Sequence, residues 1–156
     1  MDESGRHSSE RQLVVFQLAG EAYGVEITTV REIITMQPVT PIPRTPEFVR
    51  GIINLRGRVI PVVDLRRLLS LAQGDAGRET RIMVVEVGTR TVGCIVDAVK
   101  EVLTISDEVI EPPTGAAGPE GEYLKGIAKV GDSLVILVDL QRVLAADEAG
   151  GLIRAS

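Results

Sequence analysis

The chain has 156 residues, a formal net charge of −5 and only 3% aromatic residues. A chain of this length normally forms one domain and buries about two thirds of the surface of its unfolded form, so it needs no disulfide or metal. The acidic charge and the few aromatic side chains argue against a nucleic-acid-binding barrel, which needs a basic surface and stacking platforms.

Cysteine content and hydropathy set the expected compartment. Cys94 is the only cysteine, which excludes an internal disulfide and a zinc cluster and favours a reduced, intracellular setting. No apolar run reaches the roughly 18 residues of a membrane-spanning helix, and residues 1–10 lack the apolar core of a signal peptide. We expect a cytoplasmic protein with no cofactor, no metal and no direct membrane insertion, which reaches a membrane only through its partners.

Short apolar runs bounded by Gly, Asp and Asn predict a chain made mostly of strands. Asp64 and Asp139 each follow such a run and precede Leu-x-Arg-x-Leu, so we expect each to cap a short helix. Four prolines between residues 38 and 46 exclude a central strand there. The predicted strands cover residues 12–19, 22–27, 51–55, 58–64, 81–87, 91–97, 124–130 and 133–138.

An internal repeat organises these elements. Residues 48–69 align without a gap with residues 123–144, at an offset of 75, and seven of the 22 pairs are identical. Residues 23–33 align with residues 92–102 at an offset of 69. Two matches in the same order predict two halves with one structural plan, and the spacing of the strands within each half suits a meander or a small barrel. The turn-forming residues 111–121 account for the longer connection in the second half.

The repeat also predicts the domain organisation. We expect one domain at residues 11–146, with a first half at about 11–72 and a second half at about 80–146. A disordered N-terminal tail (1–10) and a C-terminal tail (147–156) flank this domain. Whether strands are exchanged between the two halves is left open by the sequence.

Few residues of the sequence are plausible catalytic groups. His7, the only histidine, lies in the polar tail, and the stretches at 115–118 and 150–151 lack the Gly-Lys-Ser/Thr ending of a phosphate loop. Cys94 lies in an apolar run, where packing rather than reactivity is expected. Six carboxylates near apolar strands are acid–base candidates, but four of them occupy equivalent places in the two halves, which favours capping or pairing with Arg31, Lys100, Arg67 or Arg142. The six are Glu26, Glu32, Asp64, Asp97, Glu101 and Asp139.

The segment at 51–66 reads Gly-Ile-Ile-Asn-Leu-Arg-Gly-Arg-Val-Ile-Pro-Val-Val-Asp-Leu-Arg. It resembles the CheW family, whose signature is an Asn-Leu-Arg-Gly turn followed by a Pro-(Val/Ile)-Val-Asp-Leu strand end. Further matches, such as Tyr-Gly-Val-Glu-Ile at 23–27 and Val-x-Glu-Ile at 30–33, extend the resemblance over about residues 11–146. The resemblance implies an all-β fold of two SH3-like five-stranded β-barrels packed together, with short helices.

The same resemblance implies a function and partners. It suggests a non-catalytic adaptor in bacterial chemotaxis signal transduction, recruited to membrane receptor arrays. The adaptor would bind the cytoplasmic tip of chemoreceptors, a helical hairpin, and the regulatory domain of the histidine kinase CheA. The alternative within this fold is an adaptor for a chemosensory pathway that controls pilus motility or development. A nucleic-acid or small-ligand barrel and an enzyme remain as rivals from other classes.

The resemblance points to a receptor-binding surface on particular residues. Arg56 breaks the repeat, because its counterpart is Gly131, so the barrel turn itself does not require an arginine. Apolar side chains recur at a spacing of three in matching places of both halves and are expected to line one groove for the receptor helices, unless they are ordinary core. The expected receptor-binding residues are Arg56, Val30, Ile33, Glu32, Val99 and Val102. Residues 38–48 are available for kinase contact, but no individual residue can be assigned.

Overall fold

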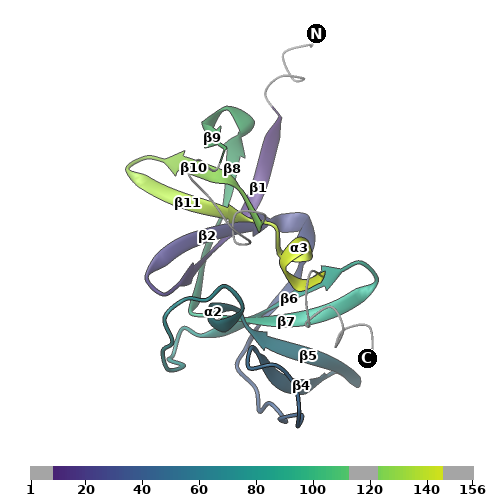
Figure 1. The fold of residues 1–156 in the computed structure, drawn as a ribbon. Coiled ribbons are helices and arrows are strands. Elements are labelled where there is room, and N and C mark those ends of the chain that lie inside the picture. Colours follow the sequence, from purple (N-terminus) through teal and green to yellow (C-terminus); the bar gives the residue numbers. More distant parts are fainter. Residues whose placement is uncertain (1–8, 113–122, 146–156) are drawn as a thin grey trace.

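The computed structural model describes residues 9–112 and 123–145, which form two small barrels stacked one on the other (Figure 1). The first barrel has the strand order β3-β6-β7-β5-β4, and the second has β8-β1-β2-β11-β10-β9. The strands of the first barrel are β3 (Val30–Thr35), β4 (Val49–Leu55), β5 (Arg58–Asp64), β6 (Arg81–Val87) and β7 (Arg90–Val96). Those of the second are β1 (Glu10–Leu18), β2 (Glu21–Glu26), β8 (Ala98–Ser106), β9 (Ile110–Glu111), β10 (Leu124–Val130) and β11 (Ser133–Val138).

Four short helical segments complete the described chain, and the all-β prediction is confirmed. None of the described helices is long and apolar enough to cross a membrane. The strand β1 begins at Glu10, one residue inside the expected N-terminal tail. The helical segments are η1 (Ile27–Thr29), α2 (Leu65–Leu68), η2 (Asp107–Val109) and α3 (Leu140–Ala145).

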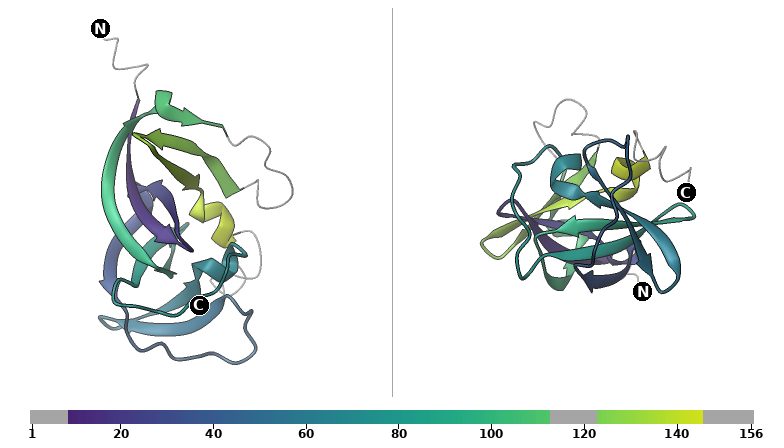
Figure 2. Two further views of the ribbon diagram at one scale, coloured as in Figure 1. Left: turned by 90° about the vertical axis from the view of Figure 1, so that its left-hand side faces the viewer. Right: turned by 90° about the horizontal axis from the view of Figure 1, so that it is seen from below.

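The two barrels do not coincide with the two halves of the repeat. The hairpin β1–β2 of the first half belongs to the second barrel, and the equivalent hairpin β6–β7 of the second half belongs to the first barrel. Each exchanged hairpin joins its host through a parallel pair, Tyr23 beside Ile136 and Gly93 beside Val62. The views in Figure 2 show this interleaving. Neither barrel can therefore form from one half of the chain alone.

Three apolar clusters follow from the exchange. Each barrel has a small interior core, and a larger central core lies between the barrels. In β6, for example, Ile82 and Val84 point into the first barrel, while Met83 and Val85 point into the central core. Because the exchanged hairpins are buried on both faces, their strands read as nearly continuous apolar runs instead of alternating ones.

Three strands were not predicted from the sequence: β3, β8 and the two-residue β9. Of these, β3 and β8 contain a β-bulge at the same place in the repeat. Pairing of β3 with β6 skips Arg31, and pairing of β8 with β1 skips Lys100. An extra residue breaks the alternation of two by which strands are identified, so the apolar residues recur at a spacing of three.

Both predicted helix caps are present. The Asp64 carboxylate accepts the backbone N–H groups of Arg66 and Arg67, at 3.1 and 3.4 Å, and opens α2. The Asp139 carboxylate accepts the backbone N–H of Arg142 at 3.1 Å and opens α3. Leu65 of α2 and Leu144 of α3 are buried in the central core, so both helices help to hold the barrels together.

An ion pair unforeseen from sequence joins the barrels where the chain passes from β7 to β8. The Arg66 guanidinium donates to both carboxylate oxygens of Asp97, with N–O distances of 2.9 and 2.6 Å. The same carboxylate accepts the backbone N–H of Ala19, in the β1–β2 turn, at 2.8 Å. The guanidinium also donates to the carbonyl of Ala72 at 2.9 Å. One side chain of the first barrel thus fixes the hairpin turn of the second.

Replacing Arg66 by alanine is expected to lower the free energy of unfolding by about 2 kcal/mol, because it leaves a half-buried carboxylate without its charged donors. The measurement is urea denaturation monitored by circular dichroism. The matched control is Arg67→Ala, since Arg67 is more exposed and its contacts to Asp64 and Glu47 are longer, at 3.8 and 3.2 Å. Equal losses in the two variants would contradict a special role for Arg66.

Candidate functional site

Arg56 lies at the tip of the β4–β5 hairpin in a conformation that suits glycine. Its φ is +52°, and Gly57 follows at +87°. The Asn54 side-chain oxygen accepts the backbone N–H of Gly57 at 2.8 Å and closes the turn. The counterpart of Arg56 in the β10–β11 hairpin is Gly131, with a φ of +61°. A residue with a Cβ costs about 1 kcal/mol more than glycine in this region, so folding does not favour arginine at this position.

The Arg56 side chain reaches across to β3. Its guanidinium forms an ion pair with the Glu32 carboxylate and remains 68% exposed. The pair borders a cavity of about 230 Å³ at the open end of the first barrel, whose walls include Leu55, Ile60 and Val84. An exposed ion pair contributes little to stability, and the outward face of the guanidinium still offers donors to carboxylates or carbonyls of a partner. The structure thus brings the predicted residues Arg56 and Glu32 together.

The four predicted apolar residues all face the space between the barrels. Directly paired residues of neighbouring strands share a face of the sheet. Val30 pairs with Val85 and Ile33 with Met83; Val99 pairs with Phe16 and Val102 with Val14. Each of these four partners belongs to the central core. A spacing of three would place two residues of a regular strand on opposite faces, and the bulges at Arg31 and Lys100 restore a common face.

The four residues differ in exposure. Val30 and Val99 are half-buried and pack against the central core, as the core interpretation expects. Ile33 and Val102 lie farther out and are 40% and 52% exposed. The outer pair is therefore accessible to a partner, and the inner pair supports it. We call these four residues, together with Glu32 and Arg56, the β3–β8 surface.

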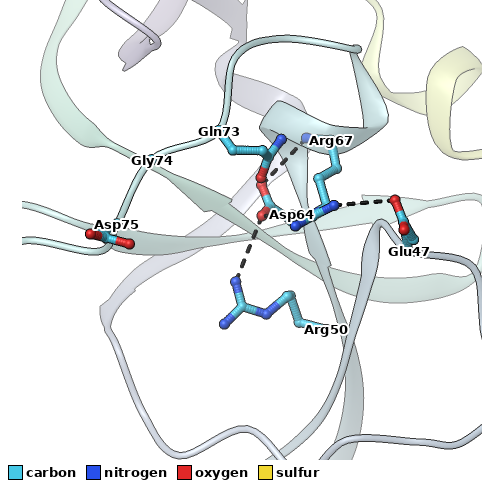
Figure 3. A pocket seen from close by; sticks show the side chains of 7 residues that line it. All are labelled: Glu47, Arg50, Asp64, Arg67, Gln73, Gly74 and Asp75. Carbon is cyan, nitrogen blue, oxygen red and sulfur yellow. Dashed lines mark hydrogen bonds and ion pairs between the residues drawn. The ribbon is translucent and has the colours of Figure 1, made fainter.

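A polar cavity of about 710 Å³ lies elsewhere on the first barrel (Figure 3). Asp64 forms its floor, with Arg50 at 3.6 Å and Arg67 at 3.8 Å from one carboxylate oxygen. Arg67 also donates to Glu47 at 3.2 Å. The charges in this cavity largely neutralise one another, and Asp64 is already engaged in capping α2. Gln73, Gly74 and Asp75 of the connector complete the wall.

Five of the six acid–base candidates have structural partners. Asp64 and Asp139 cap helices, and Asp97 binds Arg66. Glu26 pairs with Arg11 at 3.0 Å and Lys125 at 3.8 Å. Glu32 pairs with Arg56; Glu101 alone has no ion pair or side-chain hydrogen bond within residues 9–112 and 123–145. Over the same ranges no three His, Cys, Asp or Glu side chains gather to hold a metal ion.

Cys94, His7 and two glycine stretches were also considered as reactive or ligand-binding groups. Cys94 is fully buried in the central core, and this burial raises the pKa of its thiol from 9.0 to about 12. Its expected role in packing is confirmed. His7 and the glycine stretches at 115–118 and 150–151 lie outside the described residues.

Known proteins share the sequence pattern and the fold of this chain. Residues 12–148 match the CheW-like domain. The chain is 37% identical over 139 residues to the chemotaxis protein CheW of Klebsiella aerogenes, covering 88% of this chain and 84% of that protein. It is also 37% identical to the chemotaxis protein CheW of Rhizobium meliloti, at 88% and 90% coverage. The crystal structure of the scaffolding protein TtCheW from Thermoanaerobacter tengcongensis superposes with a TM-score of 0.82 at 39% identity, covering 88% and 94% of the two chains.

The chain belongs to the CheW-like family of chemotaxis scaffold proteins. The predicted resemblance and the predicted fold class, two SH3-like barrels packed together, are thereby confirmed. The CheW-like match covers both barrels, the exchanged hairpins and the whole β3–β8 surface.

Three exposed apolar residues of this CheW-like fold were not predicted from the sequence: Val109, which is 37% exposed, and the more exposed Val59 and Leu134. Val59 in β5 is 62% exposed and Leu134 in β11 is 56% exposed. They are equivalent at the offset of 75, and each lies in the strand that follows a hairpin turn, opposite Asn54 or Lys129. The repeat contained the signal, since both halves keep an aliphatic residue there, but the exposure of the two side chains is known only from the structure.

Proposed function

We propose that this chain is a non-catalytic cytoplasmic adaptor that couples the tips of chemoreceptors to the regulatory domain of the histidine kinase CheA, and is recruited to membrane receptor arrays through these partners. The family membership supports the adaptor role. The observation that supports a specific binding site is Arg56, because an arginine occupies a left-handed turn position at which the other barrel has glycine. A strained residue that folding does not require suggests a functional role.

The β3–β8 surface is the proposed receptor site. A receptor hairpin is a pair of helices with an apolar stripe, and such a stripe docks onto an apolar strip flanked by polar groups. Ile33 and Val102 supply the accessible apolar area, and Val30 and Val99 form its base. Arg56, oriented by Glu32, supplies charged donors at one end.

Val59 and Leu134 are the proposed kinase contacts. Each barrel end presents one of these exposed apolar side chains beside its hairpin. A double-barrel partner presents similar barrel ends, so apolar contacts of this kind allow barrel-to-barrel pairing at either end of the chain. We expect Val59→Asp and Leu134→Asp to reduce kinase binding while receptor binding is retained.

The proposed receptor site is tested by comparing Arg56→Gly and Arg56→Glu with wild type. Arg56→Gly should fold with equal or slightly higher stability, because glycine suits the turn, and should bind receptor-tip fragments about tenfold more weakly after losing a charge-assisted contact. Arg56→Glu should abolish receptor binding, since it sets a second carboxylate beside Glu32. The measurements are urea denaturation, co-sedimentation with receptor fragments, and kinase autophosphorylation in the reconstituted complex.

The matched control is Arg58→Glu, which makes the same charge change two residues away on β5. Within residues 9–112 and 123–145, the Arg58 side chain forms one hydrogen bond, to Thr91 at 3.3 Å, and no ion pair. This variant should leave receptor binding nearly unchanged. Equal binding by wild type and both Arg56 variants would make Arg56 a turn residue only. If wild type binds neither receptor fragments nor a CheA-type kinase, the adaptor function itself is refuted.

An adaptor in a pathway that controls pilus motility or development is the second candidate. The chain is 32% identical over 120 residues to Protein FrzA of Myxococcus xanthus, which covers 77% of this chain and 75% of that protein. Deletion of the gene, followed by separate assays of swimming and of surface motility, distinguishes the two outputs. A defect in surface motility alone would favour the second candidate.

A further inference from the structure

Glu101 on β8 is the repeat counterpart of Glu32 on β3, at the offset of 69. Each glutamate directly follows the bulge residue of its strand, Lys100 or Arg31. Each also pairs with a residue of a barrel interior, Val15 for Glu101 and Val84 for Glu32. The two carboxylates therefore occupy equivalent positions in the two barrels.

Only one of the two carboxylates is satisfied internally. Arg56 reaches Glu32 from the β4–β5 turn, but Gly131 stands at the equivalent turn and offers no side chain. Glu101 has no ion pair or hydrogen bond through its side chain in the described part of the chain. The second barrel thus keeps the carboxylate but lacks its cation.

The neighbouring bulge residue shows the same asymmetry. In the first barrel Arg31 pairs with Glu86 at 2.6 Å. In the second barrel Lys100 has no ion pair within the described residues, because Gln17 stands at the position equivalent to Glu86. In the second barrel Gly131 and Gln17 stand where the first barrel has the partners Arg56 and Glu86. The charges of Glu101 and Lys100 remain.

The position of Glu101 is accessible to a partner. Lys100, Glu101 and Val102 are three consecutive exposed residues on β8, which is the outermost strand of its sheet. Val102 lies on the face of β8 that looks to the central core, whereas Glu101 lies on the barrel-interior face of the same strand. Because β8 is an edge strand among the described strands, a helix that covers Val102 and crosses the free edge of β8 reaches Glu101 as well. A carboxylate at the edge of an apolar contact is partly desolvated by the partner, which makes an opposite charge on that partner favourable.

We propose that Glu101 binds an arginine or lysine side chain of the receptor helix. This side chain neutralises Glu101 in the complex, as Arg56 neutralises Glu32 in the first barrel. This inference rests on the proposed receptor function and adds a specificity determinant to it. Receptors with a basic residue at this point of the helix are accepted, and receptors with an acidic residue there are rejected.

The test blocks Glu101 in two independent ways. Glu101→Gln removes the charge. Gly131→Arg retains Glu101 and supplies an internal cation from the turn, as Arg56 does in the first barrel. A Cβ at Gly131 meets no atom within 4 Å, and its φ of +61° is close to that of Arg56, so Gly131→Arg should fold. The probe is a purified receptor-tip fragment, and the readouts are its dissociation constant and the salt dependence of binding, with urea denaturation as the check on folding.

Both variants should weaken receptor binding by about tenfold and reduce its salt dependence, while kinase binding stays as in wild type. Asp75→Asn is the control, because it removes one exposed negative charge from the connector, outside the β3–β8 surface. If Glu101→Gln and Gly131→Arg bind the fragment as wild type does while Arg56→Glu does not, this inference is overturned and the receptor function stands. If wild type fails to bind the fragment, both are overturned.

Discussion

Replacing Phe16 by alanine is expected to lower the free energy of unfolding by about 4 kcal/mol, a large share of the stability of a domain of this size. Phe16 is fully buried in the central core, and its ring stacks on Tyr23 with centroids 6.0 Å apart. It lies on β1, which the first half of the chain contributes to the second barrel. The cavity left by alanine opens between the two barrels, where both sheets lose contacts.

The exchange of hairpins also predicts how many transitions the Phe16→Ala variant shows on unfolding. Since each barrel contains strands from both halves, the variant should still unfold in a single transition, with circular dichroism and tyrosine fluorescence changing together in urea. Phe16→Leu is the matched control and should lose less than about 2 kcal/mol. Two separate transitions in Phe16→Ala would show that the barrels unfold independently, and would refute the view that the exchanged hairpins couple them.

The Cys94 thiol is expected to be about a thousandfold less reactive in the native protein than a free thiol at pH 8. Burial raises its pKa from 9.0 to about 12, so the thiolate fraction falls by about three powers of ten, and the side chain has no exposed surface. The measurement is the rate of alkylation by iodoacetamide, followed by mass spectrometry, with and without urea. The Cys94→Ala variant identifies unspecific labelling, and native labelling as fast as in urea would contradict the buried position.

The same pKa shift predicts a pH dependence of stability. The buried thiol stays protonated up to pH about 12, whereas in the unfolded chain it ionises from about pH 9. Between these values the unfolded state binds fewer protons than the native state, so the free energy of unfolding falls as pH rises, by about 1.4 kcal/mol per unit. Because tyrosines and lysines also titrate in this window, the quantity to measure is the difference in slope between wild type and Cys94→Ala.

Much of the architecture was predictable from local signals. The eight predicted strands are all present, because each is a short apolar run that ends at a turn residue such as Gly57 or Gly131. The caps Asp64 and Asp139 were predictable for a similar reason, since an acceptor before Leu-x-Arg-x-Leu satisfies backbone groups only a few residues away. The repeat then showed that the same elements occur twice along the chain, and the resemblance to the CheW family implied the double barrel.

The candidate site was predicted only as a set of residues. Arg56 was predicted because its counterpart in the repeat is a glycine. Four apolar residues were predicted because both halves have aliphatic side chains at these positions: Val30, Ile33, Val99 and Val102. Their common face was not visible, since it depends on bulges that appear only when the partner strands are known. The contact of Arg56 with Glu32 likewise depends on how the hairpin β4–β5 lies over β3.

Eight of the strands, the two caps, the repeated plan, the family and the residues that depart from the repeat could be predicted from the sequence. The exchange of hairpins, the ion pair by which Arg66 joins the barrels through Asp97, and the lack of a partner for Glu101 among the described residues became known from the structure. The two groups of features differ in the sequence separation of the residues that interact. Strands, turns and caps arise from interactions between residues near in sequence. The parallel pairs of the exchanged hairpins and the Arg66–Asp97 ion pair join residues 31 or more positions apart, and they depend on which backbone edges meet in space.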